Sequence, residues 1–209
     1  MNNSYYKVNG INNDTLIVSF AGNDTLINGI KRFEFLNFLE KNFNNIDKHF
    51  YIDHHFDSYH KGISGISNNI DQTIIYLKNE IKKYKNVIFL GASSGGYASI
   101  LFGSLLNINH VIAFIPQTIR LKQNIDEKYR DISGYINNTT QYYIYGDTSI
   151  SNINDVHHIS HCERIAHHPN VFLTKKNIFK LKIMRDNGEL YNLIYKVGNL
   201  GSPTTPPVD

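Results

Sequence analysis

Residues 87–102 read Val-Ile-Phe-Leu-Gly-Ala-Ser-Ser-Gly-Gly-Tyr-Ala-Ser-Ile-Leu-Phe. An apolar run typical of a buried strand leads directly into the pattern Gly-x-Ser-x-Gly, and a segment with helical spacing follows. This order of strand, sharp turn and helix is the context in which the pattern presents a nucleophilic serine. Small side chains are needed around so tight a turn, and Gly91, Gly95 and Gly96 meet that need. The stretch therefore predicts a nucleophile elbow with Ser93 as the nucleophile.

Other Gly-rich turns between a strand and a helix bind phosphate groups, and the residues around Ser93 argue against them. A P-loop needs Gly-Lys-Ser/Thr, which this segment lacks. A dinucleotide-binding fingerprint fits poorly, because five further strand-helix units surround this one. A structural turn without chemistry is the alternative that stays open.

An oxyanion hole needs two N–H donors close to the nucleophile. The backbone N–H of Ser94, at the start of the expected helix, points toward the place where negative charge would develop. The second donor normally comes from the loop after an earlier strand, and the strand beginning near Thr15 ends at a glycine. Ala21, Gly22 and Asn23 are therefore candidates for the second donor, with a plain turn as the alternative.

The rest of the chain alternates between short apolar runs and longer segments with helical spacing. This alternation is typical of a mostly parallel sheet covered by helices on both faces. Strands are expected at Thr15–Ala21, Phe50–Asp53, Val87–Leu90, Val111–Ile115, Gln141–Tyr145 and Val171–Thr174. Helices are expected at Phe33–Asn44, Asn68–Lys85, Ser94–Leu106, Asp155–His168 and Ile178–Tyr195.

Length and composition set further limits. At 209 residues and 41% hydrophobic content, the chain is expected to form a single domain over residues 1–197, followed by a disordered, proline-rich tail over 198–209. A net charge of +3 without a basic block argues against nucleic acid and membrane partners. No apolar run is long enough to span a bilayer, so a cytoplasmic protein is expected. The sequence suggests no cofactor.

Several motifs, the elbow among them, resemble those of a family of small α/β-hydrolase-fold proteins often associated with capsule and other surface-glycan biosynthesis. The motifs are Phe20-Ala-Gly22, Phe33-Glu-Phe35, Tyr59-His-Lys-Gly62, Gly91-Ala-Ser-Ser-Gly-Gly-Tyr-Ala98, Ala113-Phe-Ile-Pro-Gln117 and Asp186-Asn-Gly-Glu-Leu190. The resemblance covers nearly the whole chain apart from the tail. It implies a three-layer α/β-hydrolase-like fold, with a mostly parallel sheet of about six or seven strands. It also implies a serine esterase or deacylase acting on acylated sugars, and Gln117 of its Pro-Gln turn is a candidate for substrate contact. Tyr59 or His60 is a further candidate, because their loop is expected near the carboxyl edge of the sheet.

Two aspartates compete for the role of the acid in a catalytic triad. In this fold the chain order is Ser, then Asp or Glu, then His, and both Asp147 and Asp155 follow the strand expected at 141–145. The resembling family has an Asp just before a helix that contains His, which matches Asp155. Asp155 is also typical of a helix N-cap, so both interpretations stay open.

The base of the triad is the element that the sequence lacks at its usual place. In this fold the base is a histidine after the last strand, and no histidine follows His168. Lys176 would serve only if burial lowered its pKa, and His60 or His157 would have to reach the elbow from another segment. Otherwise the site is degenerate, and the protein binds a glycan or protein partner without turnover. We therefore expect weak or absent ester hydrolysis, and no histidine nitrogen within about 3.2 Å of the Ser93 hydroxyl.

The sequence also allows interpretations of the histidines that give them no catalytic role. His54, His55 and His60 fall in one loop, but their spacing matches no established metal-ligand pattern, so no metal site is expected. His157, His161 and His168 would share one stripe of the helix expected at Asp155–His168. A solvated helix face is the simplest interpretation of that stripe.

Overall fold

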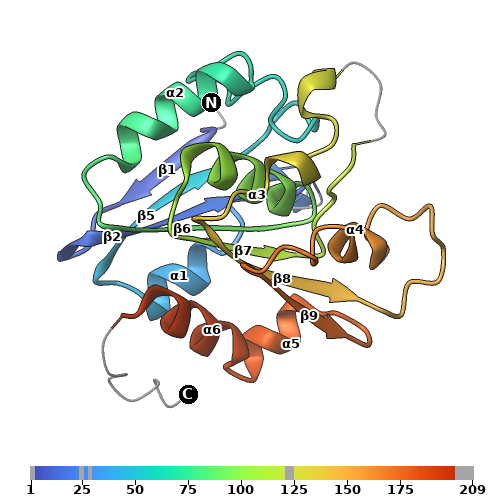
Figure 1. Ribbon diagram of the computed structural model, residues 1–209. Helices are drawn as coiled ribbons and strands as arrows, with labels where there is room; N and C mark the ends of the chain where they lie inside the picture. Colours follow the sequence, from blue (N-terminus) through green and yellow to red (C-terminus); the bar gives the residue numbers. More distant parts are fainter. Residues whose placement is uncertain (1–2, 24–25, 28–29, 121–124, 201–209) are drawn as a thin grey trace.

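The computed structural model describes residues 3–23, 26–27, 30–120 and 125–200 (Figure 1). Its centre is a seven-stranded sheet in the order β1-β5-β2-β6-β7-β8-β9. The strands are β1 (Tyr5–Val8), β2 (Asn12–Phe20), β5 (Ile46–Tyr51), β6 (Asn86–Ala92), β7 (His110–Phe114), β8 (Gln141–Asp147) and β9 (Val171–Lys176). Neighbouring strands pair in parallel except at the edge, where β1 pairs antiparallel with β5. A separate two-stranded ribbon joins β3 (Leu26–Ile27) to β4 (Ile30–Lys31).

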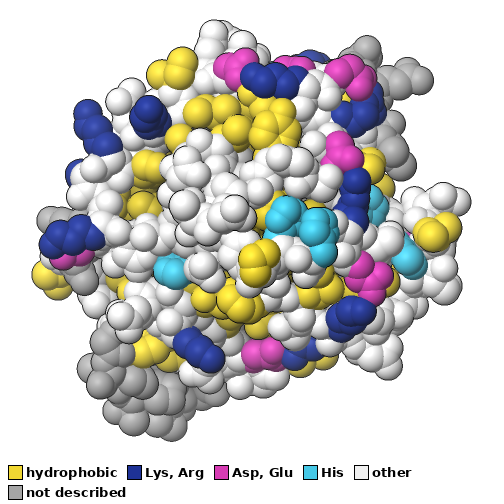
Figure 2. Space-filling model, viewed as in Figure 1, with side chains coloured by type: hydrophobic (Ala, Val, Ile, Leu, Met, Phe, Trp, Pro, Cys, Tyr) yellow, Lys and Arg dark blue, Asp and Glu magenta, His cyan; other side chains and the backbone are white. Residues whose placement is uncertain are grey.

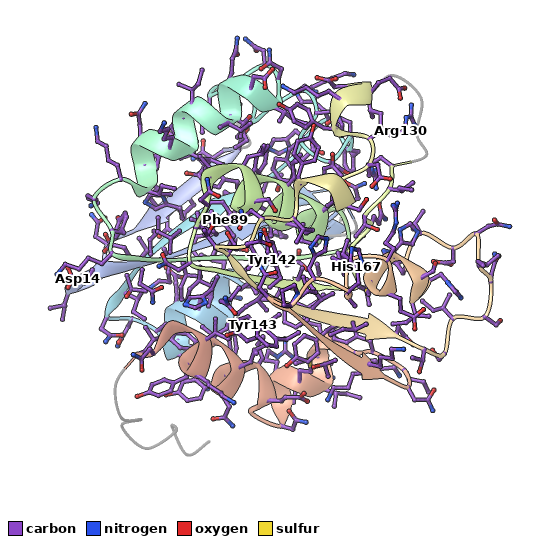
Figure 3. The ribbon with its side chains drawn as sticks, viewed as in Figure 1. Asp14, Phe89, Arg130, Tyr142, Tyr143 and His167 are labelled. Atoms are coloured by element: carbon purple, nitrogen blue, oxygen red, sulfur yellow. The ribbon has the colours of Figure 1, made fainter. Side chains whose placement is uncertain are left out.

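Helices cover both faces of the sheet. The helices are α1 (Leu36–Asn42), α2 (Ile70–Ile81), α3 (Ser94–Leu106), α4 (Ser160–Glu163), α5 (Leu181–Asp186) and α6 (Glu189–Gly198), with 3-10 turns at Glu127–Tyr129 and Ser133–Tyr135. Figure 1 shows α2 and α3 on one face, and α1, α5 and α6 on the other. Tyr142 and Tyr143, neighbours on β8, point into the two opposite apolar layers (Figure 3). No helix in the described segments is long and apolar enough to cross a membrane.

All of the strands expected from the sequence are present, as β2, β5, β6, β7, β8 and β9. The largest boundary error is in β5, which begins at Ile46 and not at Phe50. Three of the missed residues, Asp47–His49, are polar but buried. Lys48 is 0% exposed, and its Nζ donates to the backbone carbonyls of Phe43 and Ile46. Because these hydrogen bonds satisfy the ammonium group, a charged side chain can occupy a core strand that an apolar pattern would not predict.

Three strands were not predicted: β1, β3 and β4. The side chains of Tyr5–Lys7 in β1 are exposed, so this edge strand lacks the continuous apolar run of a buried one. β3 and β4 have two residues each, which is too short to carry a periodic pattern.

The helices were predicted with uneven accuracy. α3 coincides with its expected range, while α1 and α2 are shorter than expected at both ends. The single helix expected over Ile178–Tyr195 is two helices, because Gly188 adopts a left-handed conformation (φ 78°) between α5 and α6. Residues 201–209 of the expected tail lie outside the described residues.

The helix expected over Asp155–His168 is wrong. Only Ser160–Glu163 is helical, and the residues before it form turns. Asp155 does not cap a helix: its Oδ1 accepts the backbone N–H of His157, two residues on, at 2.8 Å. His158 forms an isolated parallel bridge with Asp147 at the end of β8. These contacts replace helical ones, so the expected solvated stripe of His157, His161 and His168 does not exist.

Candidate active site

The site lies at the carboxyl edge of the sheet, where the loops after β2, β5, β6, β7 and β8 meet. Ser93 follows β6 directly and has φ 54° and ψ −118°, a conformation that few residues other than glycine adopt. Its backbone N–H donates to the carbonyl of Phe114 on β7 at 2.9 Å, which ties the turn to the neighbouring strand. The strained conformation at a strand-to-helix turn is the geometry expected of a nucleophile elbow.

The glycines around Ser93 allow the helix to approach the sheet closely. A Cβ on Gly95 would lie 2.1 Å from the backbone oxygen of Phe20 at the end of β2. A Cβ on Gly91 would lie 2.3 Å from the backbone of Gly95. Neither backbone can give way, so both positions require glycine.

The prediction that no histidine would reach Ser93 is wrong. Nε2 of His157 lies 2.8 Å from Oγ of Ser93, so the hydroxyl donates to Nε2 when that nitrogen is unprotonated. The loop after β8 makes this contact, because it turns back over the carboxyl edge and does not form the expected helix. His157 was one of the two histidines that the sequence offered for this position.

Asp155 lies on the other side of the same imidazole. Its Oδ1 is 3.7 Å from Nδ1 of His157, and the two side chains are 40% and 23% exposed. This separation is an ion-pair distance and not a hydrogen bond, so the carboxylate acts on the ring mainly through its charge. The order Ser93, Asp155, His157 also follows the chain order of a serine triad.

Asp147, the competing aspartate, is occupied elsewhere. Its Oδ1 accepts from the backbone N–H and the hydroxyl of Ser149, and its Oδ2 accepts from the backbone N–H of Phe179 at 2.8 Å. Burial raises the pKa of Asp147, but these hydrogen bonds outweigh burial and leave it below the usual value. This carboxylate therefore joins the loop after β8 to the segment before α5.

The structure does not bring His60 to Ser93. The backbone N–H of Asp126 donates to Nδ1 of His60 at 3.1 Å, and Nε2 lies 3.0 Å from the hydroxyl of Tyr97. Both ring nitrogens are thus engaged beneath α3. Burial, assisted by the nearby charge of Arg120, lowers the pKa of His60 to about 4, so the ring is neutral at pH 7.

Tyr59 and Lys176 are also held in other roles. The Tyr59 side chain is fully buried, and its hydroxyl donates to the backbone carbonyls of Ala21 and Tyr51. Nζ of Lys176 lies 2.6 Å from a carboxylate oxygen of Glu189 on α6, so this amine is engaged in an ion pair. Lys176 is therefore not placed as a base. No group of three or more metal-ligating side chains occurs in the described ranges, the loop of His54, His55 and His60 included.

The predicted oxyanion donors differ in their present partners. Ser94 begins α3, where the first N–H groups have no partner within the helix. The N–H of Ala21 donates to the carbonyl of Tyr51 at 3.0 Å, and the N–H of Gly22 donates to Oε2 of Glu34 at 2.8 Å. The half-buried Asn23 has a buried Oδ1 without a partner. Glu34 lies in the motif Phe33-Glu-Phe35, but no role could be assigned to it from the sequence, because nothing there indicates that its side chain reaches the end of β2.

Gln117 lies directly beside the nucleophile. Its Nε2 is 3.4 Å from Oγ of Ser93, and the residue is only 5% exposed. Its Oε1 is buried without a partner. The Pro-Gln turn after β7 thus belongs to the site.

Many of the histidines lie close to Asp155 in the sequence. Five of the ten histidines fall between His157 and His168, and Figure 2 shows histidine side chains gathered on the face close to α4. His167, labelled in Figure 3, is exposed and lies near α4, with its ring 4.2 Å from that of His168. His161 accepts the backbone N–H of Thr118 at its Nδ1, at 3.3 Å. Of these five histidines, His157 is the one that lies within hydrogen-bond distance of Ser93.

Comparison with known proteins relates this architecture to solved structures. The sequence matches no protein-family model, and a search of curated proteins finds no match. A variant of the capsule O-acetyltransferase of Neisseria meningitidis serogroup A, in complex with CoA, is similar in structure with a TM-score of 0.61 at 14% identity, over 90% of each chain. A lipase-esterase related protein from Clostridium acetobutylicum has a TM-score of 0.60 at 15% identity, over 93% of this chain and 98% of that one.

A third similar structure is a lid-less α/β serine hydrolase from Xanthomonas campestris. It has a TM-score of 0.56 at 10% identity, over 97% of this chain and 90% of its own. At these identities the similarity concerns the fold. With its mostly parallel seven-stranded sheet, the helices on both faces and the serine turn after β6, the chain has the α/β-hydrolase fold.

Proposed function

We propose that the protein is a serine acyl-ester hydrolase, an esterase or deacylase, with Ser93 as nucleophile, His157 as base and Asp155 as the acid whose charge stabilises the protonated base. The observation that supports this most directly is the 2.8 Å distance between Nε2 of His157 and Oγ of Ser93. A working base must lie within hydrogen-bond reach of the proton that it removes. The rival interpretation, a binding protein without turnover, rested on the absence of a base near Ser93.

In the acylation step, Oγ of Ser93 attacks the carbonyl carbon of the ester. The hydroxyl proton passes to Nε2 of His157 while the new C–O bond forms, and the carbonyl electron pair moves onto the oxyanion. The intermediate then collapses, the bond to the alcohol breaks, and His157 returns the proton to the leaving alkoxide. Asp155, 3.7 Å from Nδ1, stabilises the imidazolium formed in between.

In the deacylation step, His157 removes a proton from a water molecule that attacks the acyl-Ser93 ester. The bond between the acyl carbon and Oγ then breaks while His157 returns the proton to Oγ, so the carboxylic acid leaves and the Ser93 hydroxyl is restored. An alcohol in place of this water would give acyl transfer and a new ester. The balance between the two outcomes depends on which acceptor reaches the acyl group, since the residues used are the same.

For the substrate we propose an acylated glycan. The motif resemblance to proteins associated with surface glycans supports this class, as does the similar structure of a capsule O-acetyltransferase. Because that transferase structure holds CoA, acetyl-CoA is the thioester donor to include when transfer is tested.

A fluorophosphonate probe tests the proposal on the intact protein. It phosphonylates an activated serine and should label the wild type once, at Ser93, as located by peptide mass analysis. Ser93→Ala should remove all labelling, and His157→Ala should slow it by about a thousandfold. If the wild type stays unlabelled at a probe excess that marks a control esterase, the hydrolase proposal is wrong and the binding interpretation replaces it.

A product assay separates hydrolysis from transfer. The protein is incubated with an O-acetylated oligosaccharide, or with acetyl-CoA and the unacetylated oligosaccharide, and the products are analysed by mass spectrometry. We expect release of acetate from the first mixture that depends on Ser93. A glycan that gains acetyl groups in the second mixture, without acetate release in the first, would instead identify an acyltransferase.

A further inference from the structure

Two of the backbone amides expected to build the oxyanion hole already have strong acceptors. The N–H of Ala21 is part of the pairing between the ends of β2 and β5. The N–H of Gly22 meets a carboxylate oxygen of Glu34 at 2.8 Å, and an ionised acceptor makes this the stronger type of hydrogen bond. The backbone of Glu34 is held as well, because its carbonyl accepts the hydroxyl of Ser19 at 2.9 Å. Recruiting Gly22 for catalysis would require breaking this arrangement.

Gln117 offers a donor that needs no such rearrangement. Oγ of Ser93 gives its proton toward His157, so the lone pairs of Oγ face other neighbours, and Nε2 of Gln117 donates toward them at 3.4 Å. In a tetrahedral adduct the oxyanion is two bonds from Oγ. A donor at this distance from Oγ can therefore lie roughly 2.7–3.1 Å from the oxyanion, the range that stabilisation requires.

The turn that carries Gln117 is held rigidly. Ile115 adopts φ 39°, a strained value for a β-branched residue, and its N–H donates to the carbonyl of Tyr145 at 2.7 Å. Pro116 packs against α3, where a Cβ on Gly96 would lie 3.1 Å from the Pro116 Cβ. The backbone that carries Gln117 is thus fixed before a substrate binds, and the buried side chain already lies beside Ser93, so its use as an oxyanion donor requires little reorganisation.

We propose that Nε2 of Gln117 is the second oxyanion donor of this enzyme, opposite the backbone N–H of Ser94. The proposal rests on the proposed hydrolase function, and it assigns the charge-stabilising role to a side chain in place of a backbone amide after β2. Gln117 is then a catalytic residue that contacts the reacting oxygen. Glu34 is a structural residue that holds Gly22 outside the reaction.

The test compares Gln117→Met with Gln141→Met. Methionine keeps the length of the side chain and removes the donor, and Gln141 is a half-buried glutamine at the opposite end of the strands. With p-nitrophenyl acetate as substrate, Gln117→Met should lower kcat by about 10²- to 10³-fold with a KM within about threefold of the wild type. Gln141→Met should leave both constants unchanged.

A boronic acid supplies a readout that a purely structural role would not affect. It forms a tetrahedral, negatively charged adduct with Ser93, so its inhibition constant should rise by about 100-fold in Gln117→Met, in step with kcat. Gln117→Glu, which nearly preserves the shape, should lose at least as much, because it places a second negative charge beside the oxyanion. This second variant keeps the test valid if Gln117→Met does not fold.

The outcomes separate the two proposals. A wild type that fails to react with the fluorophosphonate would overturn both of them. Labelling at Ser93 together with an unchanged kcat in folded Gln117→Met would overturn only the role of Gln117. A rise in kcat of tenfold or more in Glu34→Ala, without a loss in Gln117→Met, would identify Gly22 as the donor.

Discussion

The two loops that meet at Ser93 are held by different means. The elbow after β6 is fixed by its backbone and by packing, since the residues of α3 from Ser94 to Ser104 are all buried and Gly95 touches the end of β2. The loop after β8 brings Asp155 and His157 to the same point through turns, and these two side chains are 40% and 23% exposed.

This difference predicts which substitutions lower the free energy of unfolding and which lower the rate of catalysis. Adding atoms at Gly91 or Gly95 of the elbow should mainly change the free energy of unfolding, because a Cβ at either position meets backbone. Substituting the acid-base loop should mainly change the rate, because few contacts depend on those side chains.

The largest effect should come from His157→Ala. Without the base, the Ser93 hydroxyl remains protonated at neutral pH, so kcat/KM should fall by about 10³-fold or more. The melting temperature should barely change, because the side chain is partly exposed. Ester hydrolysis and thermal unfolding measure the two quantities, and His167→Ala, an exposed histidine near α4, is the matched control. Near-normal turnover in His157→Ala would mean that another group is the base.

Gly95→Ala should show the opposite pattern. The added methyl would lie 2.1 Å from the backbone oxygen of Phe20, so α3 must move away from the sheet. We expect a loss of about 3 kcal/mol in the free energy of unfolding, measured by urea denaturation. Gly134→Ala is the control, because a Cβ there meets no atom within 4 Å. Equal stability of the two variants would show that the elbow is more pliable than its contacts indicate.

Asp155 and Asp147 should show the same contrast between rate and stability, with smaller effects. Asp155→Asn should lower kcat by about 10- to 100-fold, less than for a buried triad acid, because Asp155 is half exposed and 3.7 Å from the ring. Asp147→Asn should instead lower the free energy of unfolding by about 1–3 kcal/mol, since it loses hydrogen bonds to the loop amides. Turnover lost only in Asp147→Asn, with normal stability, would reverse the assignment.

The features of the fold that follow from local pattern were the predictable ones. The apolar runs of the central strands and the glycines around Ser93 are visible in the sequence, so the sheet and the elbow could be derived from it. The start of β5 could not be predicted from the sequence. Lys48 is buried there because it donates to backbone carbonyls that come near it only in the folded chain. The break between α5 and α6 could have been anticipated from Gly188, a common helix terminator.

The candidate site likewise contains residues that were predictable from the sequence and residues that were not. Ser93 and the neighbourhood of Gln117 were visible as motifs, whereas the approach of His157 depends on a loop whose path no periodicity encodes. The chain order Ser93, Asp155, His157 was available from the sequence, but the expected helix placed His157 on a solvated face. His60 looked equally suited by its position after a strand, and only the structure shows both of its nitrogens engaged.

The effect predicted for His60, a buried histidine, appears only under acid conditions. The pKa of His60 is lowered to about 4 in the folded protein, below its ordinary value of 6.5, so between these values the unfolded chain binds the extra proton. The stability that His60 contributes is therefore complete above pH 6.5 and is lost as the pH falls toward 4. The slope reaches at most about 1.4 kcal/mol per pH unit for one proton.

Urea denaturation of the wild type and of His60→Gln between pH 7 and pH 4.5 measures this contribution. The free energy of unfolding should fall less steeply with acid in His60→Gln, because the titrating group is gone while the glutamine amide still offers one donor and one acceptor. His49, whose pKa burial also lowers to about 4, titrates in both proteins and cancels in the difference. kcat at pH 7 should be nearly unchanged, in contrast to His157→Ala. Identical slopes together with a large loss of kcat would instead indicate that His60 takes part in catalysis.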